Sequence, residues 1–209
     1  MKKFIMFFVI GIFLTSCSYN PINSVNEVEA GMDLTNEVTS TSINEPVKLI
    51  KARSTADFYR GMGNYKRSFI IQVENLAYDK EVSVFHEMAD GTWSDYPATY
   101  DNPGDGNSEI WSTGMIEHNY IWGDEFVIRY TVNGQTYWDN NNGANYTLGS
   151  CDGTLLGTDV NVKSDFAAIY NYNETKFSGG IDVKNIVYAK EVTVVYTTDN
   201  WQTTKTFAA

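Results

Sequence analysis

The residues best suited to hold a ligand form one short run, Tyr137 to Tyr146, which reads YWDNNNGANY. Aromatic side chains pack against the apolar C–H face of a pyranose ring, and Asn amides offer both a donor and an acceptor to ring hydroxyls. The run therefore suits a neutral sugar. A turn between two strands is the competing interpretation, because Asn tolerates positive φ and Asn142-Gly143 is a strong hairpin signal.

Residue spacing predicts neither a catalytic centre nor a metal site. An EF-hand calcium loop needs Gly at its sixth position and Glu at its twelfth, whereas counting from Asp139 places Gly143 fifth and Ser150 twelfth. The chain has no paired carboxylates, and no nucleophile with His, at a usable spacing. His86 and His118 stand in unrelated contexts. We therefore expect a binding protein without catalytic residues, metal or cofactor.

The N-terminal residues predict export and lipid attachment. Lys2-Lys3 precede an apolar run, Phe4 to Leu14, that is too short for a comfortable membrane span, and the sequence Leu-Thr-Ser-Cys then ends at Cys17. This tetrapeptide resembles a bacterial lipobox, which implies removal of the signal peptide 1–16 and acylation of Cys17. An ordinary secretory signal with an incidental Cys is the alternative. Ser18 after the Cys favours the outer membrane or cell surface over the inner membrane.

Composition further narrows the partners and the folded region. Residues 18–46 carry five acidic and no basic residues, so segment 17–46 is predicted to be a lipidated Cys followed by a flexible acidic stalk. The net charge of −11 and the lack of a basic cluster argue against a nucleic-acid partner. Cys151 is the only other cysteine, so the mature chain would have no intramolecular disulfide. The sequence leaves the oligomeric state open.

From Val47 onward the chain shows short runs of Val, Ile, Tyr, Phe and Thr separated by Gly, Asn, Asp and Pro. This pattern predicts β-strands, and Val132-Asn133-Gly134-Gln135 predicts a tight hairpin turn. About a hundred residues with several short strands bury a core by stacking two sheets. We therefore predict an all-β fold, an immunoglobulin-like antiparallel β-sandwich over residues 47–148. The clearest strands are Phe69–Val73, Glu81–Phe85, Glu125–Val132 and Gln135–Trp138.

The chain then repeats itself. Residues 66–84 align without gaps with residues 176–194, and ten of nineteen positions are identical. After a two-residue shortening in the second copy, Trp93 aligns with Trp201. A repeat of this length indicates two copies of one module. We expect a linker at 149–159 and the N-terminal half of a second module at 160–209.

Three ordered motifs carry a family resemblance. They are Val-x-Asn-x-x-Tyr-x-Lys-x-Val at 73–82, a Trp after an Asp-containing turn at 93, and the run from Glu125 to Tyr146. Together they resemble the family-21 carbohydrate-binding modules, which are β-sandwiches that bind starch and glycogen. The resemblance covers residues 47–148 and about the first half of the module in 160–209.

The resemblance implies two binding surfaces in the first module. One would stack sugar on Trp93 and Trp138, with Asn140, Asn142 and nearby Asn side chains bonding hydroxyls. Starch-binding members often place a further aromatic where this chain has Val127, which puts part of this surface in doubt. The other surface would use Tyr78 for stacking, with polar contacts from Asn75, Lys80 and Asn145 and with Tyr100 nearby. The repeat extends the set to Tyr188, Lys190 and Trp201.

Each assignment has a structural competitor, since Trp93 could be a core or sheet-edge Trp and Lys80 could use its stem to cover apolar surface. Trp111 and Trp122 are interpreted as packing residues. The leading hypothesis is a membrane-anchored lipoprotein that binds α-glucan, meaning starch, glycogen or maltooligosaccharide, without catalysis. The alternative is a structural or adhesive surface lipoprotein that reuses the sandwich without sugar affinity.

Overall fold

The structure, a computed structural model, describes residues 9–11, 45–60, 62–118, 122–171 and 175–208. Its residues form two units, 36–184 and a smaller unit of 1–35 with 185–209. Cys17 and the predicted stalk, apart from residues 45 and 46, lie outside the described residues, as does the predicted signal peptide except Val9–Gly11. Among the described residues, no helix has the length and apolar character needed to cross a bilayer.

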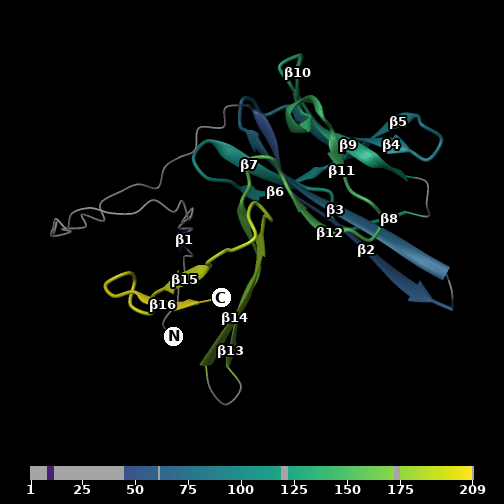
Figure 1. The fold of residues 1–209 in the computed structure, drawn as a ribbon. Helices are drawn as coiled ribbons and strands as arrows, with labels where there is room; N and C mark the ends of the chain where they lie inside the picture. Colours follow the sequence, from purple (N-terminus) through teal and green to yellow (C-terminus); the bar gives the residue numbers. More distant parts are fainter. Residues whose placement is uncertain (1–8, 12–44, 61, 119–121, 172–174, 209) are drawn as a thin grey trace, which may run out of the picture. The chain divides into compact units, whose positions relative to one another are not determined.

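The larger unit is built on two antiparallel sheets (Figure 1). One sheet has the strand order β10-β9-β4-β5, and β11 also pairs with β9. The other has the order β12-β2-β3-β7-β6, and β8 also pairs with β3. The bounds in the first sheet are β4 Lys80–Met88, β5 Trp93–Pro97, β9 Trp122–Val132, β10 Gln135–Asp139 and β11 Tyr146–Thr147. Those in the second are β2 Val47–Tyr59, β3 Met62–Glu74, β6 Thr99–Pro103, β7 Ser108–Ser112, β8 Ile116–His118 and β12 Gly153–Leu156.

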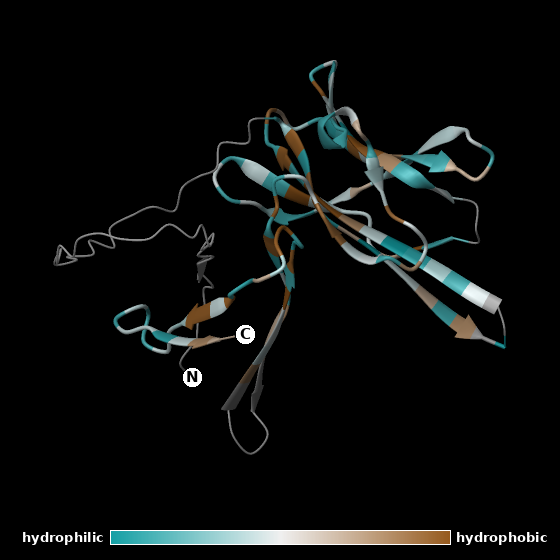
Figure 2. Ribbon diagram, viewed as in Figure 1, coloured by the Kyte–Doolittle hydropathy of each residue, from teal (hydrophilic) through white to brown (hydrophobic). Residues whose placement is uncertain are grey.

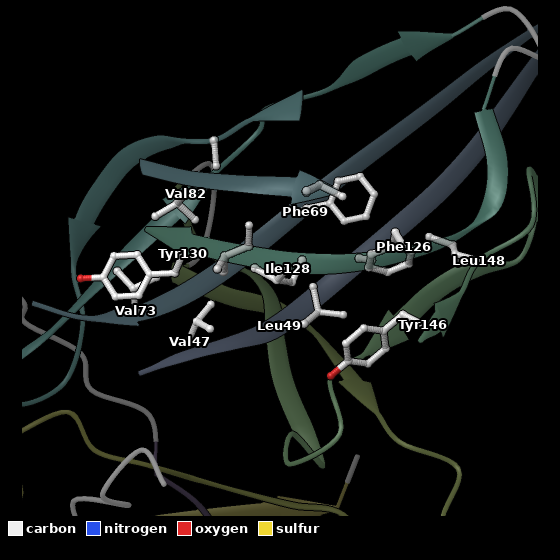
Figure 3. Close-up of a cluster of buried hydrophobic side chains, with 14 of the residues drawn as sticks. Val47, Leu49, Phe69, Val73, Val82, Phe126, Ile128, Tyr130, Tyr146 and Leu148 are labelled. Atoms are coloured by element: carbon white, nitrogen blue, oxygen red, sulfur yellow. The ribbon is translucent and has the colours of Figure 1, made fainter. Parts of the chain in front are cut away.

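The two sheets enclose one hydrophobic core, which confirms the predicted β-sandwich (Figure 3). Alternate residues of each central strand point inward, because successive side chains of a strand face opposite sides of a sheet. Hydrophobic and hydrophilic residues accordingly alternate along β2 and β3 (Figure 2). The core includes Leu49 from β2, Phe69 from β3, Val84 from β4 and Ile128 from β9, all at most 1% exposed. The Tyr130 hydroxyl donates to the Glu74 carbonyl at 2.7 Å and so ties β9 to the end of β3.

The four clearest predicted strands are all present, within β3, β4, β9 and β10. The predicted hairpin is also confirmed: Gln135 pairs with Val132, and the intervening Asn133 and Gly134 have φ values of 51° and 73°. Both turn residues are thus in the left-handed conformation that a two-residue hairpin turn requires.

The expected linker at 149–159 needs correction, because part of it belongs to the sandwich. Strand β12 lies within it and pairs with β2, from Gly153 opposite Ser54 to Leu156 opposite Lys51. Leu156 is buried. The first module therefore continues past residue 148 to include this strand.

Two hairpins follow the sandwich. In the larger unit, β13 (Val162–Asn171) pairs with β14 (Thr175–Val183). Lys51 of β2 contacts this hairpin, with its Nζ 2.5 Å from carboxylate oxygens of Asp165 and Asp182. In the smaller unit, β15 (Thr193–Tyr196) pairs with β16 (Lys205–Ala208) and with β1 (Val9–Gly11). The strands of the predicted partial second copy are thus divided between the two units.

Candidate carbohydrate-binding surfaces

The outer face of the five-stranded sheet carries a cluster of three aromatic side chains, Trp93, Phe85 and Trp138, which we call the Trp surface. Trp93 begins β5, Phe85 lies in β4 and Trp138 lies in β10. In β4, Val84 and His86 are buried while Phe85 between them is only partly buried. The alternation of the strand therefore places Phe85 on the solvent side of the sheet.

The three rings contact one another in a row. The Phe85 ring centroid is 5.3 Å from that of Trp93, with 32° between the ring planes. It is 5.7 Å from that of Trp138, with 64° between the planes. Trp138 is 41% exposed and Trp93 is partly exposed. The structure thus brings together the two tryptophans predicted as stacking platforms and joins them through a third ring.

Polar groups border this cluster on the same face. Arg129, which pairs with Trp138 across β9 and β10, forms an ion pair with Asp95 at 3.0 Å. The Ser83 hydroxyl donates to the same carboxylate at 2.7 Å. An apolar ring surface edged by charged and hydroxyl groups can stack on a sugar ring while bonding its hydroxyls.

The Asn-rich run next to Trp138 forms a tight loop around the 3-10 helix η1 (Asn141–Gly143). Asn141, Asn142 and Asn145 have φ values of 53°, 58° and 55°, in the left-handed region that Asn tolerates. Asp139 anchors the loop: its carboxylate accepts from the Leu49 amide at 2.6 Å and from the Tyr146 hydroxyl at 2.9 Å. The competing interpretation is therefore correct in that the run is a turn between two strands, β10 and β11, but these strands both pair with β9 and do not form a hairpin with each other.

Several Asn side chains of this loop have partners within the protein. Asn140 accepts from the Gly143 amide at 2.9 Å and caps η1. Asn141 donates to the Asn145 carbonyl at 2.8 Å and accepts from the Thr158 hydroxyl at 2.8 Å. Asn140 and Asn142 are exposed. Of the predicted sugar contacts, these two are the ones that lie open to solvent beside Trp138.

A second candidate surface is centred on the loop 75–79 between β3 and β4, which we call the Tyr78 loop. Tyr78 is 96% exposed, so its ring lies open to solvent. Lys80 donates to the Asn75 side chain at 2.5 Å and to Glu109 of β7 at 2.9 Å. The predicted set of Tyr78, Asn75 and Lys80 is thus held in one place, with the Lys80 side chain only 4% exposed.

The loop is connected to the predicted Tyr100 through two residues of β7. Trp111 donates from Nε1 to the same Glu109 carboxylate at 3.0 Å. Tyr100 packs edge-to-face on Trp111, with 6.3 Å between ring centroids, and is 52% exposed. A cavity of about 600 Å³ adjoins the loop, lined by residues 79–81 and 131–134.

The structure corrects the placement of Asn145, which was predicted to join Tyr78 and Lys80. Its side chain donates to Glu125 at 2.9 Å, near the start of β9. Lys80 pairs with Val132, the last residue of β9. At about 3.3 Å per residue these two positions are roughly 23 Å apart along the strand. Asn145 therefore belongs with the Asn loop of the Trp surface.

The smaller unit repeats part of the Tyr78 loop. Tyr188 is fully exposed, and Lys190 donates to the Asn185 side chain at 2.6 Å, as Lys80 does to Asn75. Lys190 also donates to the Val187 carbonyl, where Lys80 has Glu109 instead. Trp201 is 36% exposed with a φ of 66°.

Sequence reasoning missed three residues of these surfaces: Phe85, Glu109 and Trp111. Phe85 lies in a strand whose side chains alternate between the two faces of the sheet, and no pattern in the sequence distinguishes it from a residue that packs in the core. Glu109 and Trp111 are sequence-distant from Lys80, and the pairing of β3 with β7 brings them near it. Trp111 was expected to pack, and it does contact the core while also bonding Glu109.

Both histidines lie buried at one end of the sandwich beside Trp122, away from solvent. His86 stacks on Trp122 at 3.6 Å between centroids, and the Arg67 guanidinium lies 5.7 Å from the same ring. Burial, with the charges of Arg67 and His86, lowers the pKa of His118 to about 4. Burial likewise lowers the pKa of His86. These groups are placed for packing, and among the described residues no cluster of His, Cys, Asp and Glu could hold a metal ion.

Comparison with known proteins finds that part of the sandwich is similar to carbohydrate-binding modules. Residues 67–149 match the sequence model of the carbohydrate/starch-binding module (family 21). Glucoamylase 1 of Rhizopus oryzae is 38% identical over 82 residues, covering 37% of this chain and 13% of the relative. Glycogen-binding subunit 76A of Drosophila melanogaster is 36% identical over 81 residues, covering 36% of this chain and 12% of the relative. Human protein phosphatase 1 regulatory subunit 3B is 34% identical over 86 residues, covering 37% of this chain and 30% of the relative.

A solved structure gives a similar match. The starch-binding domain of Rhizopus oryzae glucoamylase, in complex with β-cyclodextrin and maltoheptaose, is 32% identical with a TM-score of 0.40, covering 53% of this chain and 98% of that one. The chain spans less than a third of the length of these curated relatives. The match to the family model and the identity to the relatives agree on one segment: residues 67–149 of this chain are similar to a family-21 carbohydrate/starch-binding module.

Proposed function

We propose that this chain binds α-glucan, such as starch, glycogen or a maltooligosaccharide, without acting on it chemically. The observation that carries the proposal is the row of aromatic rings on the Trp surface, with exposed Asn140 and Asn142 beside it. Stacked rings supply apolar contact with the sugar faces, and the amides exchange hydrogen bonds with hydroxyls at a small net gain. A single surface of this kind should bind weakly.

The Tyr78 loop is proposed as a second contact, and the Tyr188 loop of the smaller unit as a third. Each presents an exposed Tyr beside a Lys bonded to an Asn. Several weak contacts on one chain raise the effective concentration of a polymer at each of them. We therefore expect stronger retention by polymeric glucan than by short oligosaccharides.

The test is affinity electrophoresis in gels with amylopectin or glycogen, and calorimetry with maltoheptaose. Trp93→Ala with Trp138→Ala should abolish most binding, whereas Phe58→Ala should leave it unchanged. Phe58 is a suitable control because it is 67% exposed and lies on the β2–β3 hairpin, outside the proposed surfaces. Binding that survived the double substitution would remove the proposed platform. No retardation by any α-glucan would favour a structural or adhesive role, and release of reducing sugar by the purified chain would favour an enzyme.

We further propose that the protein is a lipoprotein held on a bacterial membrane, at the outer membrane or cell surface, through Cys17. The supporting observation is the charged start, the short apolar run and the Leu-Thr-Ser-Cys sequence that ends at this residue. Stable anchoring of this type needs more than one acyl chain. Expression with a labelled fatty acid should label the wild-type chain in the membrane fraction. Cys17→Ser should lose the label, and a Cys17→Ser chain that kept it would contradict the assignment.

A further inference from the structure

Phe85 occupies the position directly across from Val127. The two residues are paired in register between β4 and β9, and their side chains lie on the same outer face of the sheet. Val127 is 7% exposed. Of this pair, only Phe85 carries a ring, and Phe85 is the more exposed of the two residues.

Packing alone does not account for this ring. The buried core contains the neighbouring Val84 but not Phe85, because Phe85 points away from the second sheet. Its ring contacts are to Trp93 and Trp138, which are themselves partly exposed. A large aromatic residue held between a partly exposed and an exposed indole on a solvent-facing sheet adds little to the core and much to a stacking surface.

We propose that Phe85 is a third sugar-stacking residue of the Trp surface. This inference rests on the proposed function and specifies which groups of the surface meet the glucan. It places the middle of the platform over β4, between the ring on β5 and the ring on β10.

The arrangement of the three rings also bears on which glucan fits. The plane of Phe85 is tilted by 32° from that of Trp93 and by 64° from that of Trp138. Three coplanar rings would suit a straight ribbon such as a β-1,4-linked glucan. Tilted rings follow a chain whose successive sugars change direction, as α-1,4-linked glucose does.

The test compares two substitutions by calorimetry with maltoheptaose, using circular dichroism to confirm folding. Phe85→Leu keeps an apolar side chain and removes the ring, so affinity should fall about fivefold. Phe85→Tyr keeps the ring and should stay within twofold of wild type. Equal affinities for wild type and Phe85→Leu would overturn the inference, and so would an equal loss in both variants. If wild-type protein binds no α-glucan at all, the proposed function fails instead.

A second measurement needs no substitution. Wild-type protein with isotopically labelled Phe and Trp should give nuclear Overhauser contacts between the Phe85 ring and sugar protons of bound maltoheptaose. Phe126 serves as the internal control, because it is fully buried in the core and should give no such contacts. Contacts from the Trp93 and Trp138 rings without any from Phe85 would show that the glucan passes over the two indoles only, and would overturn the inference.

Discussion

Replacing His118 with Phe should make the folded protein less sensitive to acid. His118 is 3% exposed, and neither ring nitrogen has a hydrogen-bond partner among the described residues. Its ring lies 5.4 Å from that of Trp122 at 21° and 6.1 Å from that of Tyr65. An imidazolium there would be desolvated and would lie near the charged Arg67. Phe fills the same space without a group that titrates.

The size and sign of the effect follow from the pKa of His118, which burial, Arg67 and His86 lower from 6.5 to about 4. Each unit of difference corresponds to about 1.4 kcal/mol, so the shift is worth roughly 3 kcal/mol. Above pH 6.5 His118 is neutral in both the folded and the unfolded protein, so the free energy of unfolding has its full value. Between pH 6.5 and about 4 the unfolded chain binds the proton and the folded one does not, so the free energy of unfolding falls as the pH falls.

The assay is urea unfolding of full-length wild type and His118→Phe at several pH values from 7.5 to 4.5, followed by near-ultraviolet circular dichroism. The variant should be at least as stable as wild type at pH 7, since two desolvated nitrogens are removed. The free energy of unfolding of the variant relative to that of wild type should grow by about 2 to 3 kcal/mol as the pH falls to 4.5. His86, whose pKa is also lowered by burial, leaves a residual slope in both proteins. A difference between the two proteins that did not change with pH would refute the reasoning.

Three further perturbations test how the Asn-rich loop and the β13–β14 hairpin are held. Asp139→Ala should lower the free energy of unfolding by about 3 kcal/mol in urea titrations, because it leaves the buried donors on Leu49 and Tyr146 without their acceptor. Gly143→Ala should cost about 1 kcal/mol in the same titrations, since Gly143 has a φ of 89°. Lys51→Met should speed amide hydrogen exchange in β13 and β14 but not in β9, because Lys51 holds the two Asp side chains of that hairpin. An equal change in the exchange rate of β13, β14 and β9 would contradict the prediction for Lys51→Met.

The strands of the sandwich could be predicted because their periodicity is local. The Glu125–Val132 prediction lies within β9, where Phe126, Ile128 and Tyr130 all face the core. The Asn133-Gly134 turn was predictable for the same reason, since its conformation depends on two residues. Strand β12 was missed because Gly153–Leu156 is short and lies among Gly and Asp residues. Its strand conformation comes from pairing with β2, which no local pattern encodes.

The aromatic and polar neighbours of the site could not be predicted, because register between distant strands determines them. The Lys80–Glu109 contact joins β4 of one sheet to β7 of the other. Whether Phe85 meets Trp138 depends on how β4 and β10 each pair with β9 between them. A one-residue slip in either pairing would place one of these rings on the other face. Residue types could therefore nominate Trp93 and Trp138 but not the ring that joins them.

The Asn-rich run shows why composition alone is a weak guide to a sugar site. Asn is needed in this loop because Asn141, Asn142 and Asn145 adopt positive φ, and the side chains of Asn140, Asn141 and Asn145 are bonded within the loop or to nearby residues. A turn of the same sequence in a protein without sugar affinity would need the same bonds. The aromatic row has no such structural requirement, because its rings lie outside the core. The rings, more than the asparagines, are therefore the reason to expect a glucan on this face.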